Sequence, residues 1–318
     1  MRVLVTGGAG FIGSHLVEQC IAQGYYTVVL DNLSAGKKEN IHPKARFYQE
    51  DIGSPQVFSI LLKERIDAVF HQAGQTYVSF SLRDPSKDAL INIIGTINLL
   101  DACRRAKIKK VIYASSAAVY GNPRYLPVDE NHALEPRSGY GISKQIPERY
   151  LALYKQLYEL DYTVLRYANV YGPRQDASGE GGVVAVFIDK LMKGEAPCVF
   201  GDGEQTRDFV YVEDVVRANL LALYRGSGQV LNIGTGVPST INELVSLIKK
   251  MGPFSVESRF AAKRTGDIRE SYLDPGKAKE VLGWTAQTSL AEGIEKTLRY
   301  YIKQMEAKRS NLALGGFR

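Results

Sequence analysis

The sequence is poor in the residues that would staple a small secreted domain or hold a metal ion. It has three cysteines in 318 residues (Cys20, Cys103 and Cys198), and they are odd in number and far apart. This spacing argues against a disulfide framework and favours a reducing, cytoplasmic compartment. The four histidines show no metal-ligand spacing with the cysteines, so we predict no metal site.

Long apolar stretches are also missing. No run reaches 18 apolar residues, so a membrane-spanning helix is not expected. The N-terminus, MRVLVTGGAGFIG, reaches its glycines before an apolar stretch long enough for a signal peptide. Hydrophobic residues make up 45% and charged residues 23%, which is typical of a globular protein, and 318 residues predict about two domains.

Charge of one sign is only slightly in excess. The chain has 40 basic and 34 acidic residues, a net charge of +6. Nucleic-acid binding is one interpretation of this balance, and a solvated surface that attracts small anions is the other. The basic residues are scattered, and the tightest cluster, 104–110, falls where a helix should end and offsets its dipole. We therefore predict no nucleic-acid partner.

Buried strands and amphipathic helices alternate in the first half of the chain. Apolar, β-branched runs predict strands, and intervening patterns predict helices. The expected strands are Arg2–Thr6, Thr27–Asp31, Ala68–His71, Lys110–Ala114 and Thr163–Arg166, and the expected helices are Ile12–Ala22, Pro55–Lys63, Ala89–Arg105 and Tyr140–Glu159. Such repeated units predict an α/β fold with a Rossmann-type, doubly wound parallel sheet.

The alternation stops after Tyr171. Gly172-Pro173 and the glycine-rich stretch 179–182 indicate a loop into a smaller α/β domain, and Val230–Ile233 reads as a later strand of the first sheet. The two domains are therefore predicted to be interleaved. Residues 1–171 with about 208–236 form the dinucleotide-binding domain, and 172–207 with 237–318 form the substrate-binding domain.

A glycine-rich turn follows the first strand directly. Gly7, Gly10 and Gly13 lie between that strand and a helix, where glycine lets a pyrophosphate approach the backbone and the helix N-terminus. Asp31 ends the second strand 18 positions after Gly13, close to the expected gap of about 20. A carboxylate there binds an adenosine ribose and repels a 2′-phosphate, which favours NAD over NADP. A structural turn with a capping Asp31 is the alternative.

Tyr140 and Lys144 are the candidate catalytic pair. Four positions apart on a helix, they lie on one face, and the ammonium is expected to lower the tyrosine pKa. Such a tyrosine exchanges a proton with a sugar hydroxyl while the nicotinamide takes or returns a hydride. Ser115-Ser116, at the end of the preceding strand, offers a hydroxyl nearby, although both serines could simply cap the strand.

The motifs resemble one family through nearly the whole chain. The stretches GGAGFIG, DNLSAGK, SSAAVYG, YGISK, LRYANVYGPR, FGDGEQTRDFVYVEDV and RTGDIRES are similar to those of extended short-chain dehydrogenase/reductases. They are most similar to the UDP-glucose 4-epimerase group of nucleotide-sugar epimerases. The resemblance implies NAD as the cofactor, a UDP-sugar as the substrate and C4 epimerisation through a transient 4-keto sugar.

The resemblance also implies a role for individual residues. Ser116, Tyr140 and Lys144 match the catalytic trio. The NAD-site matches are Gly7, Gly10, Phe11, Ile12, Gly13, Asp31, Asn32, Ala35, Gly36, Asp51, Ile52, Gln72, Ala73, Gly74 and Asn92, together with Tyr140 and Lys144. The two arginines of the UDP-sugar set suit a diphosphate and its aromatic residue suits a uracil, although Phe200 and Ile241 could instead be core residues. The UDP-sugar matches, beside Ser116 and Tyr140, are Asn169, Val183, Phe200, Arg207, Ile241, Arg264 and Asp267.

Three positions differ from the residues that family members or particular relatives carry there. Pro147 stands where the family has a small residue and predicts a kink in the helix that carries Tyr140 and Lys144. Ser271 stands where relatives restricted to glucose and galactose carry a tyrosine, and it leaves room for a 2-acetamido group unless another side chain closes the pocket. Asp176 stands where UDP-glucuronate 4-epimerases tend to have arginine.

Other activities and an assembly were weighed on the same residues. A 4,6-dehydratase or decarboxylase would need an acidic residue after Ser116, but Ala117, Ala118 and Val119 follow. A UDP-glucuronate 4-epimerase and a non-catalytic dinucleotide sensor are the further alternatives.

A homodimer through a four-helix bundle is also predicted, with ordinary packing on the sheet as the alternative. Its apolar residues on the helices Ala89–Arg105 and Tyr140–Glu159 are Ile91, Ile94, Leu99, Leu151, Tyr154, Leu157 and Tyr158.

Overall fold

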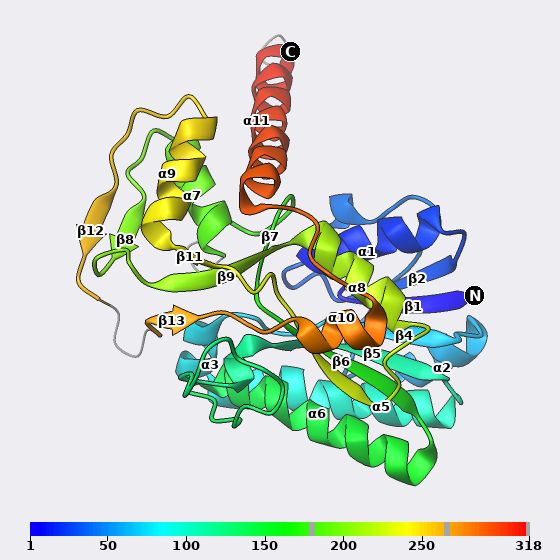
Figure 1. Cartoon of the computed structure of the whole chain (residues 1–318). Coiled ribbons are helices and arrows are strands. Elements are labelled where there is room, and N and C mark those ends of the chain that lie inside the picture. The colour runs from blue at the N-terminus through cyan, green and yellow to red at the C-terminus, as the bar shows by residue number, and fades with distance from the viewer. Residues whose placement is uncertain (178–181, 264–267, 316–318) are drawn as a thin grey trace.

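A seven-stranded parallel sheet forms the centre of the molecule (Figure 1). The fold comes from a computed structural model that describes residues 1–177, 182–263 and 268–315, with side chains described up to residue 307. The strand order is β10-β6-β5-β4-β1-β2-β3, and it reverses between β1 and β4. The strands are β1 (Arg2–Thr6), β2 (Tyr26–Asp31), β3 (Arg46–Gln49), β4 (Ala68–His71), β5 (Lys110–Ser116), β6 (Asp161–Tyr167) and β10 (Gln229–Ile233).

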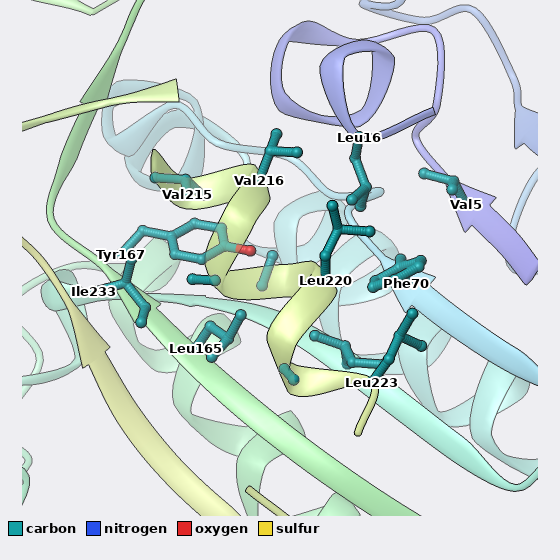
Figure 2. Packing of buried hydrophobic residues seen from close by; sticks show 14 of the residues in the cluster. Val5, Leu16, Phe70, Leu165, Tyr167, Val215, Val216, Leu220, Leu223 and Ile233 are labelled. Atoms are coloured by element: carbon teal, nitrogen blue, oxygen red, sulfur yellow. The ribbon is translucent and has the colours of Figure 1, made fainter. Parts of the chain in front are cut away.

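Helices cover both faces of this sheet. One face carries α1 (Phe11–Ala22), α8 (Val212–Ala222) and α10 (Gly276–Leu282), and its core contains side chains from all three together with β1, β4 and β6. Figure 2 shows Leu16 of α1, Leu220 of α8 and Leu223, which directly follows α8, packed near Val5 and Phe70 of the sheet. The other face carries α2 (Gln56–Lys63), α5 (Gly95–Arg105) and α6 (Gly139–Tyr158). The predicted Rossmann-type fold is confirmed.

Most predicted elements are present, and two differ. The strand β3 was not predicted, because its residues RFYQ are short, half-exposed and at the sheet edge, so they lack a buried apolar run. The single helix predicted over Ala89–Arg105 is divided. α4 (Pro85–Ala89) passes into one turn of π-helix (Leu90–Ile94), and α5 begins at Gly95.

The chain leaves the main sheet after β6 and returns for β10. Between and after these strands it builds a smaller sheet in which β9 pairs with β7, β11 and β13, and a separate pair, β8 with β12. The predicted boundary at 207/208 falls inside β9. The strands are β7 (Asn169–Tyr171), β8 (Cys198–Phe200), β9 (Thr206–Tyr211), β11 (Pro238–Thr240), β12 (Arg259–Ala261) and β13 (Glu270–Ser271).

Helices α7, α9 and α11 pack around this smaller part. Their apolar faces share one core with Tyr171, Phe209 and Tyr211. In Figure 1 the red helix α11 projects away from the main sheet beside α7 and α9. The remaining helices are α3 (Val78–Arg83), α7 (Val183–Met192), α9 (Ile241–Met251), α11 (Leu290–Gly315) and the two short 3₁₀ turns Lys38–Asn40 and Ala117–Val119. Among the described residues, no helix is long and apolar enough to cross a membrane.

Candidate active site

The turn from β1 into α1 leaves room for a ligand only because its residues are glycines. Gly7 has a φ of +67°, and a Cβ on it would lie 2.7 Å from the Ala73 nitrogen. A Cβ on Gly13 would lie 2.1 Å from the Gly7 oxygen, which no side chain tolerates. Gly10 is the N-cap of α1, and no side chain caps that helix end. The first-turn N–H groups, those of Phe11 and Ile12 included, therefore face an anion site.

Asp31 lies at the carboxyl end of β2, beside this turn. Its carboxylate is 7% exposed and accepts hydrogen bonds from the Ala9 nitrogen at 2.9 Å and the Leu33 nitrogen at 2.8 Å. Each oxygen uses one lone pair on the backbone and keeps another for a ribose hydroxyl. Gly36 belongs to the same corner, because a Cβ on it would lie 2.8 Å from an Asp31 oxygen, and Ala35 beside it is exposed.

The predicted adenine side of the site is held by Asn32 and Asp51. The Asn32 side-chain nitrogen donates to an Asp51 oxygen at 2.7 Å, and the other Asp51 oxygen accepts from the Gly53 nitrogen at 2.7 Å. Ile52 is 5% exposed and touches the position of Gly95 on α5. These contacts bring the ends of β2 and β3 together.

The loop after β4 meets the π-helical turn at Asn92. The Asn92 side chain makes two hydrogen bonds with the Gln75 backbone. Asn92 Oδ1 accepts from the Gln75 nitrogen at 2.8 Å, and Asn92 Nδ2 donates to the Gln75 oxygen at 3.0 Å. A Cβ on Gly74 would lie 2.9 Å from the Asn92 side-chain oxygen and 3.3 Å from Lys144 Nζ. Asn92 and Lys144 therefore share one corner of the site.

Gln72 and Ala73 take different positions around this corner. The Ala73 nitrogen donates to Thr6 Oγ1 at 3.2 Å, which leaves its small side chain at the loop surface. The Gln72 side chain turns toward the α8 face instead, donating to Asn219 Oδ1 at 3.0 Å and to Tyr167 Oη at 3.2 Å. Gln72 therefore offers the site its backbone rather than its amide.

The candidate catalytic trio meets where β5 ends. Ser116 ends that strand and hydrogen-bonds with the Tyr140 hydroxyl, and Ser116 Oγ also accepts from the Ala118 nitrogen at 3.2 Å. Lys144 Nζ donates to the Ala114 oxygen at 2.9 Å and lies 5.4 Å from the centre of the Tyr113 ring. Residues from one strand end and one helix turn thus form a contiguous proton-transfer site.

Burial controls the charge state of this pair. It raises the pKa of Tyr140, with a smaller lowering from the Ser116 hydrogen bond and a raising by the Asp88 charge. Burial lowers the pKa of Lys144 to about 8, and the Asp88 charge raises it. The expectation that Lys144 lowers the pKa of Tyr140 is thus not met in this structure. Removing the phenol from water disfavours its anion more than the surrounding groups favour it.

Helix α6 holds the pair in register. Ser138 is its N-cap and accepts from the Gly141 nitrogen at 3.1 Å. The helix is continuous from Gly139 to Tyr158 and contains Pro147, and the kink expected there stays a prediction. Pro147 is buried, and the Tyr140–Ser116 hydrogen bond is present despite the proline.

The predicted UDP-sugar residues lie on the smaller sheet and its helices. Arg207 on β9 donates from Nη1 to the oxygens of Thr206 at 2.7 Å and Ile268 at 2.8 Å, which orients its guanidinium. Ser271 on β13 is the register partner of Arg207. Asn169, at the start of β7, is exposed, and Val183, at the start of α7, is half-buried.

Phe200 and Ile241 were the two predicted UDP-sugar residues that could instead be core residues, and the structure places them in different surroundings. Phe200 lines a cavity of about 250 Å³ with Gln205, Lys263 and Arg269, which leaves its ring next to open space. Ile241 is 6% exposed and belongs to the core around α7, α9 and α11. Arg264 and Asp267 lie outside the described residues.

Two polar residues near the trio were not singled out from the sequence. Asp88 is 1% exposed and accepts from Gln75 Nε2 at 2.6 Å, and its charge reaches both Tyr140 and Lys144. The available signal was its place four residues before Asn92 on a helical pattern, which puts both on one face. Gln75 carried no comparable signal, since its role depends on the loop after β4.

Comparisons with known proteins agree with this arrangement. The family model described as the NAD dependent epimerase/dehydratase family matches residues 3–234. The UDP-glucose 4-epimerase of Mycolicibacterium smegmatis is 44% identical, over 95% of this chain and 98% of that protein. The crystal structure of UDP-glucose 4-epimerase with UDP-glucose from Thermotoga maritima is 47% identical with a TM-score of 0.94, covering 96% of this chain and all of that one.

A second solved structure is similar with a different ligand. The Thermus thermophilus UDP-glucose 4-epimerase in complex with NAD is 40% identical with a TM-score of 0.90, covering 95% of this chain and 99% of that one. In the part of this chain that the structure describes, no group of three or more His, Cys, Asp and Glu side chains is arranged to hold a metal ion.

Proposed function

The chain belongs to the NAD-dependent epimerase/dehydratase family, and from that premise we propose that it inverts C4 of a UDP-hexose, interconverting UDP-glucose and UDP-galactose. The observation that carries this proposal is the Ser116–Tyr140 hydrogen bond beside the buried Lys144, at the same sheet edge as the glycine turn. The relatives of 44% and 47% identity bear the name UDP-glucose 4-epimerase.

The glycine turn and Asp31 fit NAD. The turn of Gly7, Gly10 and Gly13, which carries no side chains at these positions, the uncapped N-terminus of α1 and the Asp31 carboxylate suit a pyrophosphate and an adenosine ribose. When bound, NAD supplies the hydride acceptor and donor for C4. Asp31 also disfavours a 2′-phosphate by charge repulsion.

The trio would move the proton of the sugar O4. Tyr140 as phenolate accepts that proton and returns it, Ser116 holds O4 by a hydrogen bond, and the Lys144 ammonium stabilises the phenolate. Inversion also requires the 4-keto sugar to turn over while the UDP group stays fixed. Arg207, oriented by two backbone carbonyls, suits the diphosphate anchor that this turning needs.

The enzymatic alternatives have less support. The turn after Ser116 is Ala117–Val119, without the carboxylate that a 4,6-dehydratase or decarboxylase would use. A uronic acid would bring a carboxylate near Asp176, which is exposed and accepts a hydrogen bond from Tyr77 at 2.6 Å. Two like charges there would repel each other. The intact trio argues against a non-catalytic sensor.

We further propose that N-acetylated sugars are accepted. Ser271 is half-buried and lies in register with Arg207, so a diphosphate held by Arg207 would bring the hexose near Ser271. A serine leaves space for a 2-acetamido group and offers it a hydroxyl, whereas a tyrosine ring would overpack the pocket. UDP-GlcNAc and UDP-GalNAc are therefore proposed as additional substrates.

Three organisational proposals accompany this function. The NAD-binding domain is proposed to comprise 1–171 and about 208–236, and the UDP-sugar-binding domain 172–207 and 237–318. A cytoplasmic location is proposed because the cysteines are unpaired. A homodimer through a four-helix bundle is proposed from the exposed apolar side chains of α6 and the π-helical turn.

The direct test is proton NMR of UDP-galactose, UDP-glucose and their N-acetyl forms incubated with the protein and NAD. Appearance of the C4 epimer, without loss of C6 or of carbon dioxide, is the expected result. Conversion to a 4-keto-6-deoxy sugar would favour the dehydratase instead, and unchanged spectra for every sugar would favour the sensor.

A further inference from the structure

A buried carboxylate lies beside the catalytic pair, and the steps above give it no role. Asp88, on α4, is 1% exposed. The hydrogen-bond donors to its carboxylate are neutral amides, Gln75 Nε2 at 2.6 Å and Asn92 Nδ2 at 3.4 Å. A carboxylate removed from water is costly unless an opposite charge compensates it.

The compensating charge comes from α6. Helix α4 packs against α6, and the Asp88 charge acts on Lys144 and Tyr140 in the first turns of α6. Burial lowers the pKa of His71, on β4, to about 3 and raises the pKa of Tyr113, on β5, so both are neutral near pH 7.

The next carboxylate on α6 is already paired. Glu148 forms an ion pair with Arg166 at 2.6 Å, which balances its charge. Lys144, whose pKa the Asp88 charge raises, is the cation of α6 available to balance Asp88.

Hydrogen bonds also connect Asp88 to the start of α6. Asn92 Nδ2, which reaches Asp88, donates to Ser143 Oγ at 2.9 Å, and Ser143 Oγ donates to the Tyr140 backbone oxygen at 3.0 Å. On the other side, the Gln75 amide that binds Asp88 also donates to the Tyr77 oxygen at 3.0 Å. Asp88 therefore joins the loop after β4 to the turn of α6 that carries the tyrosine.

We propose that Asp88 is a positioning residue for the epimerisation proposed above: its carboxylate is the counter-charge of the Lys144 ammonium and holds Gln75 and Asn92 against the first turn of α6. The inference rests on the proposed function for its kinetic consequence alone. Its electrostatic consequence, a field that favours the ammonium and opposes the phenolate, applies whatever the substrate is.

Removing this charge shifts both ionisations in one direction. In Asp88→Asn the side-chain shape remains and an oxygen still faces Gln75, but the negative charge is gone. Lys144 then loses its proton at a lower pH, and the Tyr140 phenolate forms at a lower pH. Both limbs of the pH profile are expected to move toward acid by about one unit, the size that a nearby charge produces.

The experiment compares the wild-type holoenzyme with Asp88→Asn and two controls. Asp101→Asn removes an exposed carboxylate from α5, and Gln75→Ala removes the hydrogen bond but keeps the Asp88 charge. Turnover of UDP-galactose is followed from pH 5.5 to 10. In parallel, ¹³C NMR of protein labelled at tyrosine Cζ follows the resonance that disappears in Tyr140→Phe.

The inference predicts an acid shift of both limbs and of the Tyr140 titration in Asp88→Asn alone. Superimposable Tyr140 titrations in wild type and Asp88→Asn would overturn it, as would an equal shift in Gln75→Ala. If Asp88→Asn does not fold, Asp88→Ser removes the same charge and carries the same expectation. If wild type turns over no sugar, the proposed function fails, while the NMR titration still decides the role of Asp88.

Discussion

At the scale of single residues, the chemistry of the site depends on how three side chains are withdrawn from water. Burial raises the pKa of Tyr140 and lowers the pKa of Lys144 to about 8, so each neutral form is favoured. The Ser116 hydrogen bond opposes this for the phenol. Catalysis by this pair therefore requires a pH at which both charged forms are present. Two predictions follow from these side chains, and a third concerns Ser271.

Tyr140→Phe removes the group that exchanges the O4 proton. Turnover is expected to fall about 10²–10⁴-fold, the usual contribution of a general acid–base group. Circular dichroism and NAD content should stay unchanged, because the ring remains. Tyr150→Phe, on the same helix but half-buried against the core of the sheet face that α6 covers, is the matched control. Retention of more than about a tenth of wild-type turnover would contradict the assignment.

The rate is expected to rise with pH up to about 8, as the Tyr140 phenolate increases, and to level off above it, because Lys144 then loses the proton that stabilises the phenolate. Initial rates from pH 6 to 10 would show this change of slope. Lys144→Arg provides the control, since a guanidinium stays protonated in this range and the rate of this variant should keep rising above pH 8 even if turnover is slower. A wild-type rate that keeps rising to pH 10 would show that Lys144 keeps its proton or is not needed.

Ser271→Tyr tests sugar selection at one position. The added ring is expected to abolish turnover of UDP-GalNAc while UDP-galactose turnover changes less than about tenfold, because only the acetamido group meets the ring. Specificity constants for both sugars measure the effect. A wild-type enzyme that converts UDP-galactose but leaves UDP-GalNAc untouched at high enzyme concentration would refute the proposal.

At the scale of elements, one histidine joins three of them beneath the site. His71, at the end of β4, lies 2.8 Å from Thr6 Oγ1 of β1 and 2.9 Å from Thr96 Oγ1 of α5. Thr96 donates to the Asn92 oxygen at 2.6 Å, so its hydroxyl accepts from His71 Nε2–H, and Thr6 donates to Nδ1. These hydrogen bonds fix the orientation of the neutral His71 ring. They also connect β1, which leads into the glycine turn, to the π-helical turn.

Acid is expected to weaken this connection. Burial, and to a lesser degree the Lys144 charge, lowers the pKa of His71 to about 3. The unfolded chain takes up that proton below about pH 6.5 and the folded chain does not, so stability is full above 6.5 and is lost as pH falls toward 3. Between these limits the free energy of unfolding should decrease with falling pH in wild type more steeply than in His71→Gln. The two slopes should differ by about 1.4 kcal/mol per pH unit. Urea unfolding at pH 7, 6, 5 and 4 measures both slopes, and parallel slopes would count against a neutral His71.

At the scale of the whole molecule, the π-helical turn and α6 expose large apolar side chains. In Figure 1 α5 and α6 lie along the lower face of the sheet. Ile94 is 53% exposed and Leu157 56%, and together with Leu90, Leu153 and Tyr158 we call them the apolar strip. The prediction was wrong for Leu99 and Leu151, which are buried in the core on this sheet face; Ile91 and Tyr154 are half-buried.

A homodimer is expected to cover this strip, because contiguous exposed apolar side chains favour association. Light scattering at micromolar concentration should give twice the chain mass of 35.2 kDa. Ile94→Glu with Leu157→Glu should give a monomer. Val237→Glu, at another residue with 62% exposure, should leave the dimer intact. A wild-type mass near 35.2 kDa would reject the proposal.

Motifs whose residues are close in sequence were predictable in detail. The β1 turn, the ribose carboxylate Asp31 and the Tyr140–Lys144 spacing each depend on one turn or one helix face, so local geometry fixes them. The parallel, doubly wound sheet was predicted from the alternation of strands and helices and from crossover handedness. The short edge strand β3 was missed because half-exposed residues carry no apolar period.

The sequence by itself therefore determined the fold class, through its alternation of strands and helices, and the glycine turn and the Tyr140–Lys144 spacing, through residues close together in the chain. Only the tertiary structure decided which side chains face the site. It turned the Gln72 amide toward Asn219, placed Ile241 in the core, paired Ser271 with Arg207 and buried Asp88 beside Lys144. These outcomes depend on packing between segments far apart in the chain, where burial and neighbouring charge, rather than spacing, set position and ionisation.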